Sequence, residues 1–327
     1  MHLSHMYKMG KEALEEKEFG IFLRGVETEF VLLNNRKIME RYTFRQRAID
    51  ACPEPDTKVE ILGVSLQTPV IMSAMTSPIS ATREDGLLKV ARGLKAAGSL
   101  MWTGSPIPAN LRELKATGVS LAANVKPLKD RKKMFQALEE IQAAGVDWVG
   151  VEIDSGMGTK ILDKQMVSNC SPLSFTELKE VREAVQTPLI FKGVLSPEDA
   201  VKAVDAGADG ILVSNHGAHT LDYLPHPFQV MDEIMEKVSG KVVVMVDGGF
   251  RRGSDVLKGL AFGASLVGLG RPILYGLAAD GEDGVRDVVK EITRELTRLL
   301  GMVGAPDVRH VGKDTLIEGF FPENREV

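Results

Sequence analysis

The 327-residue chain has few cysteines, no excess of one charge and no long apolar run. Its two cysteines, Cys52 and Cys170, are too few for a disulfide framework or a metal cluster, and they fit a reducing compartment. The net charge of -5 gives no basic field for nucleic acid or an anionic membrane. The first twenty residues lack the apolar core of a signal peptide, and no run approaches the ~18 apolar residues of a membrane span. We therefore expect a cytoplasmic protein with no nucleic-acid partner, no membrane span and no metal site.

The chain also lacks any linker, repeat array or low-complexity stretch that would divide it, so we expect a single domain over residues 1–327. From Pro69 onward, short apolar runs alternate with longer amphipathic stretches. One such stretch, SPEDAVKAVDAG, opens with Ser196 as a helix N-cap and Pro197 in the first turn. The eight apolar runs are PVIMSA (69–74), SLMWTG (99–104), VSLAAN (119–124), WVGVEID (148–154), PLIFKG (188–193), GILVSN (210–215), VVVMVDGG (242–249) and SLVGLG (265–270).

Strands that alternate with helices indicate a parallel sheet, because a crossover of a dozen or more residues must separate parallel strands. Eight such units predict an α/β fold of the (β/α)8 TIM-barrel type; a doubly wound open sheet is the alternative. We expect an N-terminal helical extension over residues 1–65, the barrel over 66–303 and a C-terminal tail over 304–327. The extension ends in KVEILGVSL, which suggests a small hairpin across the bottom of the barrel.

Polar residues gather where the apolar runs end, which is where barrel enzymes place their chemistry. The run GILV stops at Ser214, Asn215, His216 and Gly217, so a histidine is expected at the mouth of the sixth strand. The other polar or glycine residues at these ends are Thr76, Ser77, Thr103, Ser105, Asn124, Glu152, Asp154, Lys192, Asp247, Gly270 and Arg271.

The last two strands end in VDGGFRRGSD and GLGRPILYG, and each leads into a helix. Loops after strands 7 and 8 of a barrel often bind phosphate, with glycine N–H groups and a helix N-terminus as donors. Gly249, Arg251, Gly270 and Arg271 would form such a corner, the arginines adding charge-assisted hydrogen bonds. The alternative is that these glycines only form tight turns and that the arginines are solvated.

Several segments, in order, resemble one family, the FMN-dependent α-hydroxy-acid oxidases and dehydrogenases of the glycolate oxidase and lactate oxidase type. They are RGVETEFVLLNNR, FKGV, SNHG, DGGFRRGSDVLKGLAFGA and GRPILYGLAADGEDGVRDV, and the resemblance runs from about Phe19 to Met302. It implies FMN at the barrel mouth and a homo-oligomer, a tetramer in the family.

The resemblance also implies roles for individual residues. His216 would be the active-site base, Asp154 the carboxylate that orients it, and Lys192 the cation that stabilises charge on the reduced flavin. Met75, Thr76 and Ser77 would run behind the flavin. The further expected FMN contacts are Thr103, Ser105, Asn124, Glu152, Lys192, Ser214, Gly217, Asp247, Gly249, Arg251, Gly270 and Arg271.

The sequence departs from the family where the substrate carboxylate is bound by arginines and tyrosines. The residues found at those and neighbouring family positions are Ile21, Asn124, Lys126, Glu152, Lys160, Ile161 and His219. Lysine and histidine do not reproduce the bidentate fork of arginine, so this divergent member is not expected to hold a simple 2-hydroxy acid in the family's way. Lys126, Lys160 and His219 could form a looser positive patch for the substrate. We also expect Glu152 to pair with Lys192 on the adjacent strand; a purely structural ion pair is the alternative.

These observations predict an FMN-dependent oxidoreductase that transfers hydride between a CH–OH or similar carbon and the flavin. No cytochrome segment or dinucleotide-binding domain is visible, so the expected electron acceptor is oxygen or a separate electron carrier. Two alternatives are a flavin-dependent isomerase acting on a phosphorylated substrate and a flavin-binding protein without turnover. Bleaching of the flavin by a substrate would distinguish the oxidoreductase from both alternatives.

Overall fold

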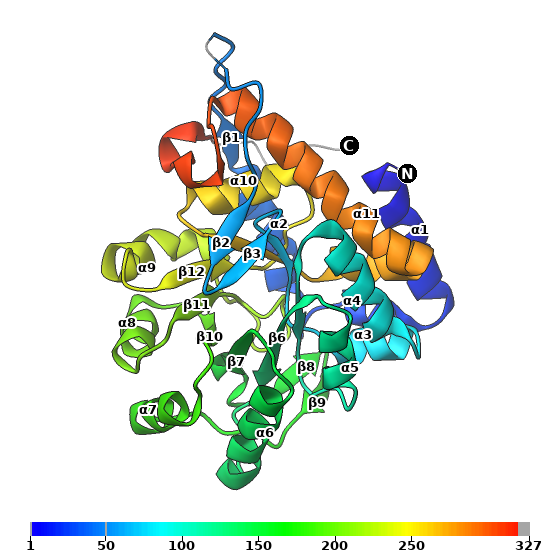
Figure 1. Ribbon diagram of the computed structural model, residues 1–327, viewed down its shortest axis with the longest axis vertical. Coiled ribbons are helices and arrows are strands. Elements are labelled where there is room, and N and C mark those ends of the chain that lie inside the picture. Colours follow the sequence, from blue (N-terminus) through cyan, green and yellow to red (C-terminus); the bar gives the residue numbers. More distant parts are fainter. Residues whose placement is uncertain (1, 50, 320–327) are drawn as a thin grey trace.

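Eight parallel strands form a barrel with helices around it in the computed structural model, which describes residues 2–49 and 51–319 (Figure 1). The strand order is β4-β13-β12-β11-β10-β7-β6-β5, and the Met75 N–H closes the ring by donating to the Trp102 carbonyl at 3.1 Å. The predicted TIM barrel is confirmed, and each apolar run overlaps one strand, with β6 and β10 extending one residue beyond their runs. The bounds are β4 (Val70–Met72), β5 (Leu100–Thr103), β6 (Ser120–Val125), β7 (Trp148–Glu152), β10 (Leu189–Val194), β11 (Gly210–Val213), β12 (Val243–Val246) and β13 (Leu266–Leu269).

The outer helices follow their strands as the alternating pattern predicts. The Ser196 hydroxyl accepts the N–H of Asp199 at 3.1 Å, so the expected N-cap of α8 is present. No described helix is long and apolar enough to cross a membrane. The helix bounds are α3 (Ser77–Thr82), α4 (Gly86–Ala97), α5 (Leu111–Ala116), α6 (Arg131–Ala143), α7 (Phe175–Ala184), α8 (Pro197–Asp205), α9 (Met231–Val238), α10 (Gly253–Ala261) and α11 (Arg271–Val303), the last interrupted at Asp280 and Gly281.

The expected hairpin at the barrel bottom is also present. Strands β2 (Val59–Ile61) and β3 (Val64–Leu66) pair in antiparallel fashion and lie across one end of the barrel (Figure 1). The Trp148 indole N–H donates to the Leu62 carbonyl at 3.1 Å, and Trp148 packs edge-to-face on Trp102. Both indoles are fully buried, so the barrel interior is filled with side chains below the mouth. Truncating such a side chain to alanine typically costs about 3–5 kcal/mol.

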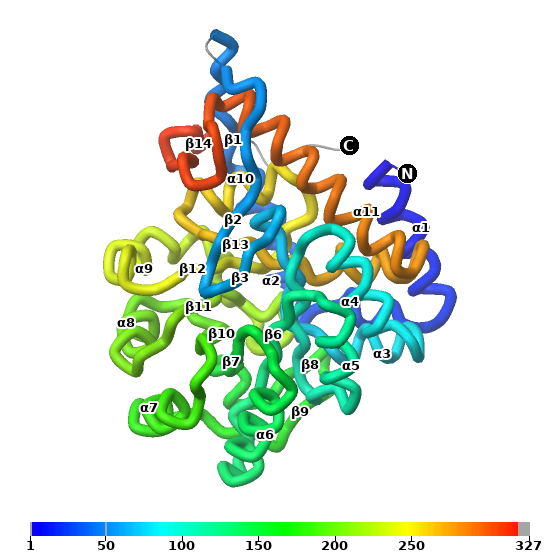
Figure 2. The backbone as a smooth tube through the Cα atoms, in the orientation of Figure 1, coloured from blue at the N-terminus to red at the C-terminus, as the bar shows by residue number. Residues whose placement is uncertain are grey.

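The N-terminal segment packs along the barrel wall and reaches the mouth. Helix α1 (Leu3–Glu16) lies beside α11, and α2 (Phe30–Glu40) follows the short helix η1 (Phe19–Leu23) (Figures 1 and 2). Strand β1 (Tyr42–Phe44) pairs with β14 (Leu316–Glu318), which ties the N-terminal segment to the C-terminal tail (Figure 2). The C-terminal tail expected over 304–327 therefore contains a strand in its described part, and its last residues, 320–327, lie outside the described residues.

Candidate active site

A cavity of about 1380 Å³, open solvent at its mouth included, lies at the carboxyl ends of the barrel strands. Most of the predicted site residues line it. Thr103, Asn124, Asp154 and Ser214 do not, and they lie behind the wall. The predicted residues in the lining are Met75, Thr76, Ser77, Ser105, Lys126, Glu152, Lys160, Lys192, His216, Gly217, His219, Asp247, Gly249, Arg251, Gly270 and Arg271.

His216 stands on a tight corner at the end of β11. Residues 216–218 all have positive φ, at 54°, 59° and 75°, a conformation that turns the chain sharply and that non-glycine residues seldom adopt. The Ser214 hydroxyl accepts the N–H of His216 at 3.0 Å and supports the corner. Strained backbone of this kind persists only where surrounding contacts hold it, and it is common at active sites.

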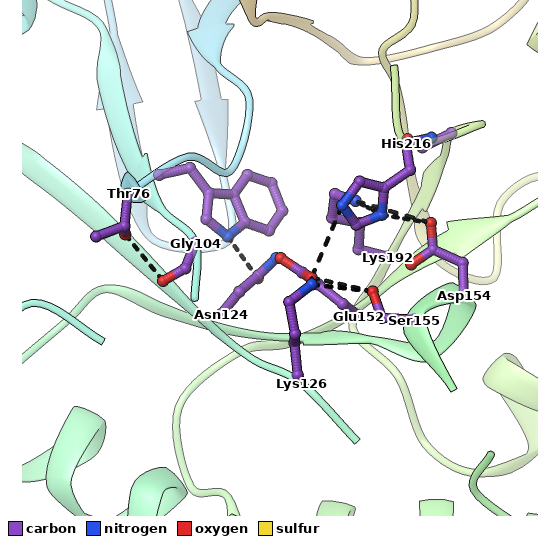
Figure 3. Close-up of polar contacts among 11 residues, drawn as sticks. Thr76, Gly104, Asn124, Lys126, Glu152, Asp154, Ser155, Lys192 and His216 are labelled. Carbon is purple, nitrogen blue, oxygen red and sulfur yellow. Dashed lines mark hydrogen bonds and ion pairs between the residues drawn. The ribbon is translucent and has the colours of Figure 1, made fainter. Parts of the chain in front are cut away.

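Asp154 orients the His216 ring. Its Oδ2 lies 2.8 Å from Nδ1, while Lys192 Nζ lies 3.0 Å from the same nitrogen (Figure 3). Burial opposes the charge of Asp154, but His216 and Lys192 outweigh it and lower the pKa of this carboxyl. An ionised carboxylate can only accept and the Lys192 ammonium can only donate, so the two compete for Nδ1. We assign the Nδ1 proton to the shorter contact, with Asp154 at 2.8 Å, which makes Lys192 an electrostatic neighbour at 3.0 Å and leaves Nε2 as the basic nitrogen. Asp154 fits only because residue 193 is glycine, since a Cβ there would lie 2.1 Å from the Asp154 Cγ.

Lys192 is buried and stays charged. Burial alone would lower its pKa, but Asp154, Glu152 and Asp247 outweigh that effect, and the pKa of Lys192 is raised above its ordinary value. Its Nζ lies 3.9 Å from the Asp154 carboxylate. The site therefore contains a fixed positive charge next to the imidazole.

Glu152 pairs with Lys126 and not, as the sequence suggested, with Lys192. Lys126 Nζ donates to the Glu152 carboxylate and, at 3.1 Å, to the Ser155 hydroxyl (Figure 3). Lys192 is instead engaged by Asp154. Burial opposes ionisation of Glu152, but Lys126, Lys192 and His216 lower its pKa, so this carboxyl is a carboxylate. The Lys126–Glu152 pair is almost completely buried, with both side chains at most 6% exposed.

Further donors fix the Glu152 carboxylate in place. Asn124 Nδ2 donates to Oε1 at 3.2 Å, and the Trp102 indole N–H donates to Asn124 Oδ1 at 2.7 Å. The carboxylate thereby lies with Oε2 3.9 Å from His216 Nε2. His216 is thus flanked by one carboxylate at each ring nitrogen, Asp154 at Nδ1 and Glu152 near Nε2.

The three cations expected as a positive substrate patch all reach the cavity, but none offers a free charge. Lys126 is paired with Glu152, and Lys160 Nζ lies 2.8 Å from the Glu27 carboxylate. Burial and the nearby Arg271 lower the pKa of His219 to about 3, so this imidazole is neutral and its Nε2–H donates to the Arg24 carbonyl at 3.0 Å.

The corner after β12 and β13 differs from the predicted substrate patch, because its arginines have no carboxylate partner in the described chain. Arg251 and Arg271 line the cavity there, and neither has a carboxylate within 4 Å among the described residues. Burial lowers the pKa of Arg271 to about 10, and its buried Nε has no hydrogen-bond partner within the described chain. Gly248 and Gly249 turn the chain with φ of 109° and 85°, values that favour glycine.

This corner fits a phosphate group. Arg251 and Arg271 are half-buried, and Arg271 Nη2 donates to the Arg24 and Gly217 carbonyls at 3.1 and 3.2 Å. These carbonyls do not neutralise the charge, so an anion would complete the corner. Arg271 also lies in the first turn of α11, where the helix dipole favours negative charge. Two buried oxygens on the same wall, Ser73 Oγ and Asp247 Oδ1, also have no partner in the described residues. They leave hydrogen-bonding capacity for a hydroxylated chain, as the ribityl phosphate of FMN requires.

Helix α2 contributes residues that sequence reasoning missed. Arg36 Nη1 donates to the Gly249 carbonyl and to Asp255, both at 2.7 Å, and Asn35 exchanges hydrogen bonds with Asn215. Both residues lie in the LLNNR segment that carries part of the family resemblance. Their role depends on how α2 docks against β11 and β12, which no local pattern reveals.

A short hairpin that follows β7 in the chain lines one side of the mouth. Strands β8 (Thr159–Ile161) and β9 (Lys164–Val167) supply Ile161, Met166 and Val167 to the cavity wall. The Leu162 N–H donates to the Gly25 carbonyl at 2.7 Å, which fastens the hairpin to the N-terminal segment.

Comparison with known proteins places this geometry in context. The model of the family described as FMN-dependent dehydrogenase matches residues 10–165 and 157–318. A glycolate oxidase of Arabidopsis thaliana is 31% identical, with 94% of this chain and 93% of that protein covered. An L-lactate oxidase of Lentilactobacillus hilgardii is 29% identical over 97% and 94%.

Solved structures give the same result. A crystal structure of mandelate oxidase superposes with a TM-score of 0.88 at 29% identity, covering 97% of this chain and 99% of that one. A mandelate oxidase mutant solved with a monooxide FMN adduct superposes with a TM-score of 0.86 at 31% identity, covering 95% and 100%.

Proposed function

Because the chain belongs to the FMN-dependent dehydrogenase family, we propose that it oxidises a CH–OH carbon of a small molecule at the barrel mouth, with His216 as the base. The substrate is not a simple 2-hydroxy acid. Family membership confirms two expectations from the sequence, namely that the protein is an oxidoreductase and that its cofactor is FMN.

The observation that carries the proposal is the Asp154–His216 pair. A base must be in the correct tautomer and within reach of the substrate proton. Asp154 at 2.8 Å holds the proton on Nδ1, and Nε2 is the ring nitrogen left to take a proton from a substrate hydroxyl. The imidazolium that forms is stabilised by Asp154 and by the second carboxylate, Glu152, 3.9 Å from Nε2.

FMN, when bound, would accept the hydride from the carbon that bears the substrate hydroxyl. Arg251, Arg271 and the glycines after β12 and β13 would hold its phosphate, and Met75, Thr76 and Asp247, which line the cavity, would contact the remainder. Lys192 places a buried positive charge in the wall of the cavity, where it stabilises negative charge that develops as the carbon is oxidised.

The electron acceptor that returns the cofactor to its oxidised form is oxygen or a separate carrier. Oxygen has the support of relatives named as oxidases. We propose a homo-oligomer, tetrameric by family resemblance. The cytoplasmic location stays a prediction, since a relative 28% identical is named a peroxisomal (S)-2-hydroxyacid oxidase.

Anaerobic mixing of the FMN-loaded protein with a panel of alcohols and hydroxy acids tests the proposal. At least one compound should bleach the flavin, and His216→Gln should slow the bleaching without releasing the cofactor. An FMN-loaded protein that no compound of the panel reduces would favour the isomerase or non-catalytic alternatives. Efficient reduction by lactate or glycolate would contradict the proposed substrate class.

A further inference from the structure

We infer that Glu152 is a specificity-determining residue. Its carboxylate forms a buried ion pair with Lys126, so this ammonium group is not available to bind an anionic substrate. The substrates are therefore uncharged alcohols with an apolar substituent. This inference rests on the proposed function, and it follows from how charge is distributed along the cavity wall.

The basic residues of the cavity fall into two groups. Four have a carboxylate within 4 Å; the pairs are Arg36–Asp255, Lys126–Glu152, Lys160–Glu27 and Lys192–Asp154. Within the described chain, Arg251 and Arg271 have none. These two lie at the corner that fits the FMN phosphate, so binding of the cofactor neutralises them. Every other cation of the described lining is then paired, and the Lys160–Glu27 pair is the most exposed of the four, at 32% and 43%. Around His216, where the reacting carbon must lie, the cations Lys126 and Lys192 are in buried pairs.

Lys126 shows why an incoming anion cannot simply share a cation. Its ammonium group donates to Glu152 and Ser155, and its side chain is only 6% exposed. A substrate carboxylate that approached Lys126 would also approach Glu152, and two carboxylates at short range repel each other strongly in a poorly hydrated site. Glu152 cannot swing aside, because Asn124 and Ser155 also hold it.

The same carboxylate faces the base. Glu152 Oε2 lies 3.9 Å from His216 Nε2, the nitrogen that takes the proton. Any group next to the reacting carbon therefore meets negative charge on that side. An uncharged neighbour such as an amide, an ester or a hydrocarbon avoids this repulsion.

Apolar side chains from two segments line another part of the mouth. Phe22 and Leu32 come from the N-terminal segment, and Ile161, Met166 and Val167 come from the β8–β9 hairpin. Burying apolar substrate surface against these side chains provides binding free energy in proportion to the area covered. These side chains thus favour binding of a hydrocarbon substituent and provide no charge to bind a carboxylate.

A matched pair of compounds tests the inference on the unmodified holoenzyme. Mandelate and 2-hydroxy-phenylacetamide share one skeleton and differ in a carboxylate against an uncharged amide. Under anaerobic conditions, the second-order rate constant for flavin reduction should be at least ten times larger with the amide than with mandelate. Equal rates, or faster reduction by mandelate, would overturn the inference while leaving the proposed oxidation intact.

A binding measurement decides the question independently of turnover. Oxalate is titrated against the holoenzyme, and its affinity is read from the change in the flavin absorption spectrum. Glu152→Gln keeps the shape and removes the charge, so oxalate should bind at least ten times more tightly than to the unmodified protein. The double variant Lys126→Met with Glu152→Gln should lose this gain, because the freed cation is absent.

The control is Glu177→Gln, which frees Arg131 in an ion pair that lies outside the cavity lining. It should leave oxalate affinity unchanged. Unchanged affinity in Glu152→Gln, with the variant folded by thermal melting, would overturn the inference. If that variant does not fold, the acid and amide comparison on the unmodified protein still decides. A flavin that neither compound reduces, together with the oxalate gain, would support the specificity role and count against the proposed reaction.

Discussion

The two sides of the cavity differ in whether their cationic side chains have carboxylate partners. After β12 and β13, Arg251 and Arg271 have no carboxylate within 4 Å among the described residues. Around His216, Lys126 and Lys192 each have an acidic partner. The first side needs an anion from outside the chain, whereas the second is already neutral.

This difference separates cofactor binding from substrate selection. The corner after β12 and β13 carries motif residues on which the family resemblance rests, and the FMN phosphate is our proposed partner for its two arginines. The His216 side contains the expected base and orienting carboxylate, together with the buried Lys126–Glu152 pair. The barrel can therefore retain one half of its mouth and change the other, because separate strands build the two halves.

Removing the base should have the largest effect. His216→Gln should slow anaerobic flavin reduction by roughly 10²–10⁴-fold, the usual range for a general base. Stopped-flow absorbance measures the rate, and fluorescence titration should show FMN affinity within a few-fold of the unmodified protein. A rate within tenfold would mean that another group takes the proton.

Lys192→Met should act on the same side with a somewhat smaller effect. Loss of the buried cation removes stabilisation of developing negative charge, so reduction should slow by roughly 10²–10³-fold. FMN affinity should change much less than the rate. An unchanged reduction rate would assign Lys192 a structural role, as the partner of Asp154 alone.

Arg271→Leu tests the other side. A charge-assisted hydrogen bond stabilises by about 1.5–3 kcal/mol, so FMN affinity should fall about 10–150-fold in a fluorescence titration. Riboflavin, which has no phosphate, should bind equally to the variant and the unmodified protein. Arg252→Met is the matched control, because Arg252 is paired with Glu295 and lies outside the cavity lining. An equal loss for both flavins would mean that Arg271 supports the fold and not the phosphate.

His226 should give the smallest effect, through pH. Burial lowers the pKa of His226 from 6.5 to about 3, and its Nε2–H donates to the Gly248 carbonyl at the phosphate corner. Between these two values the unfolded chain binds a proton there and the folded chain does not. The stabilisation is therefore complete above pH 6.5 and is lost as pH falls, by up to about 1.4 kcal/mol per pH unit.

Urea unfolding between pH 7 and pH 5 measures this slope. His226→Gln should show a shallower loss of stability than the unmodified protein, while the contribution of His219 cancels because both proteins contain it. Parallel curves would show that His226 is not the neutral group the structure indicates.

The sequence predicted the eight strands and the polar residues at the mouth, because each depends on local periodicity or on a strand end. It also predicted that Gly249, Arg251, Gly270 and Arg271 gather at one corner; that this corner binds phosphate stays a prediction. It did not predict which lysine pairs with Glu152. Strand β7 lies between β6 and β10, so Lys126 and Lys192 both flank Glu152. Lys192 pairs with Asp154, and Lys126 is left to pair with Glu152. The contribution of Arg36 could not be predicted either, since α2 reaches the corner through packing between segments more than two hundred residues apart.

The tryptophan pair inside the barrel has a practical consequence. The chain has only two tryptophans, Trp102 and Trp148, and both are fully buried along the barrel interior. Trp148 contacts the bottom hairpin, while Trp102 contacts Asn124 below the mouth. All indole emission therefore originates within the barrel, close to where FMN would bind. Energy transfer from the indoles to the flavin makes the unlabelled protein a sensor of its own cofactor occupancy, and the same emission reports the opening of the barrel on unfolding.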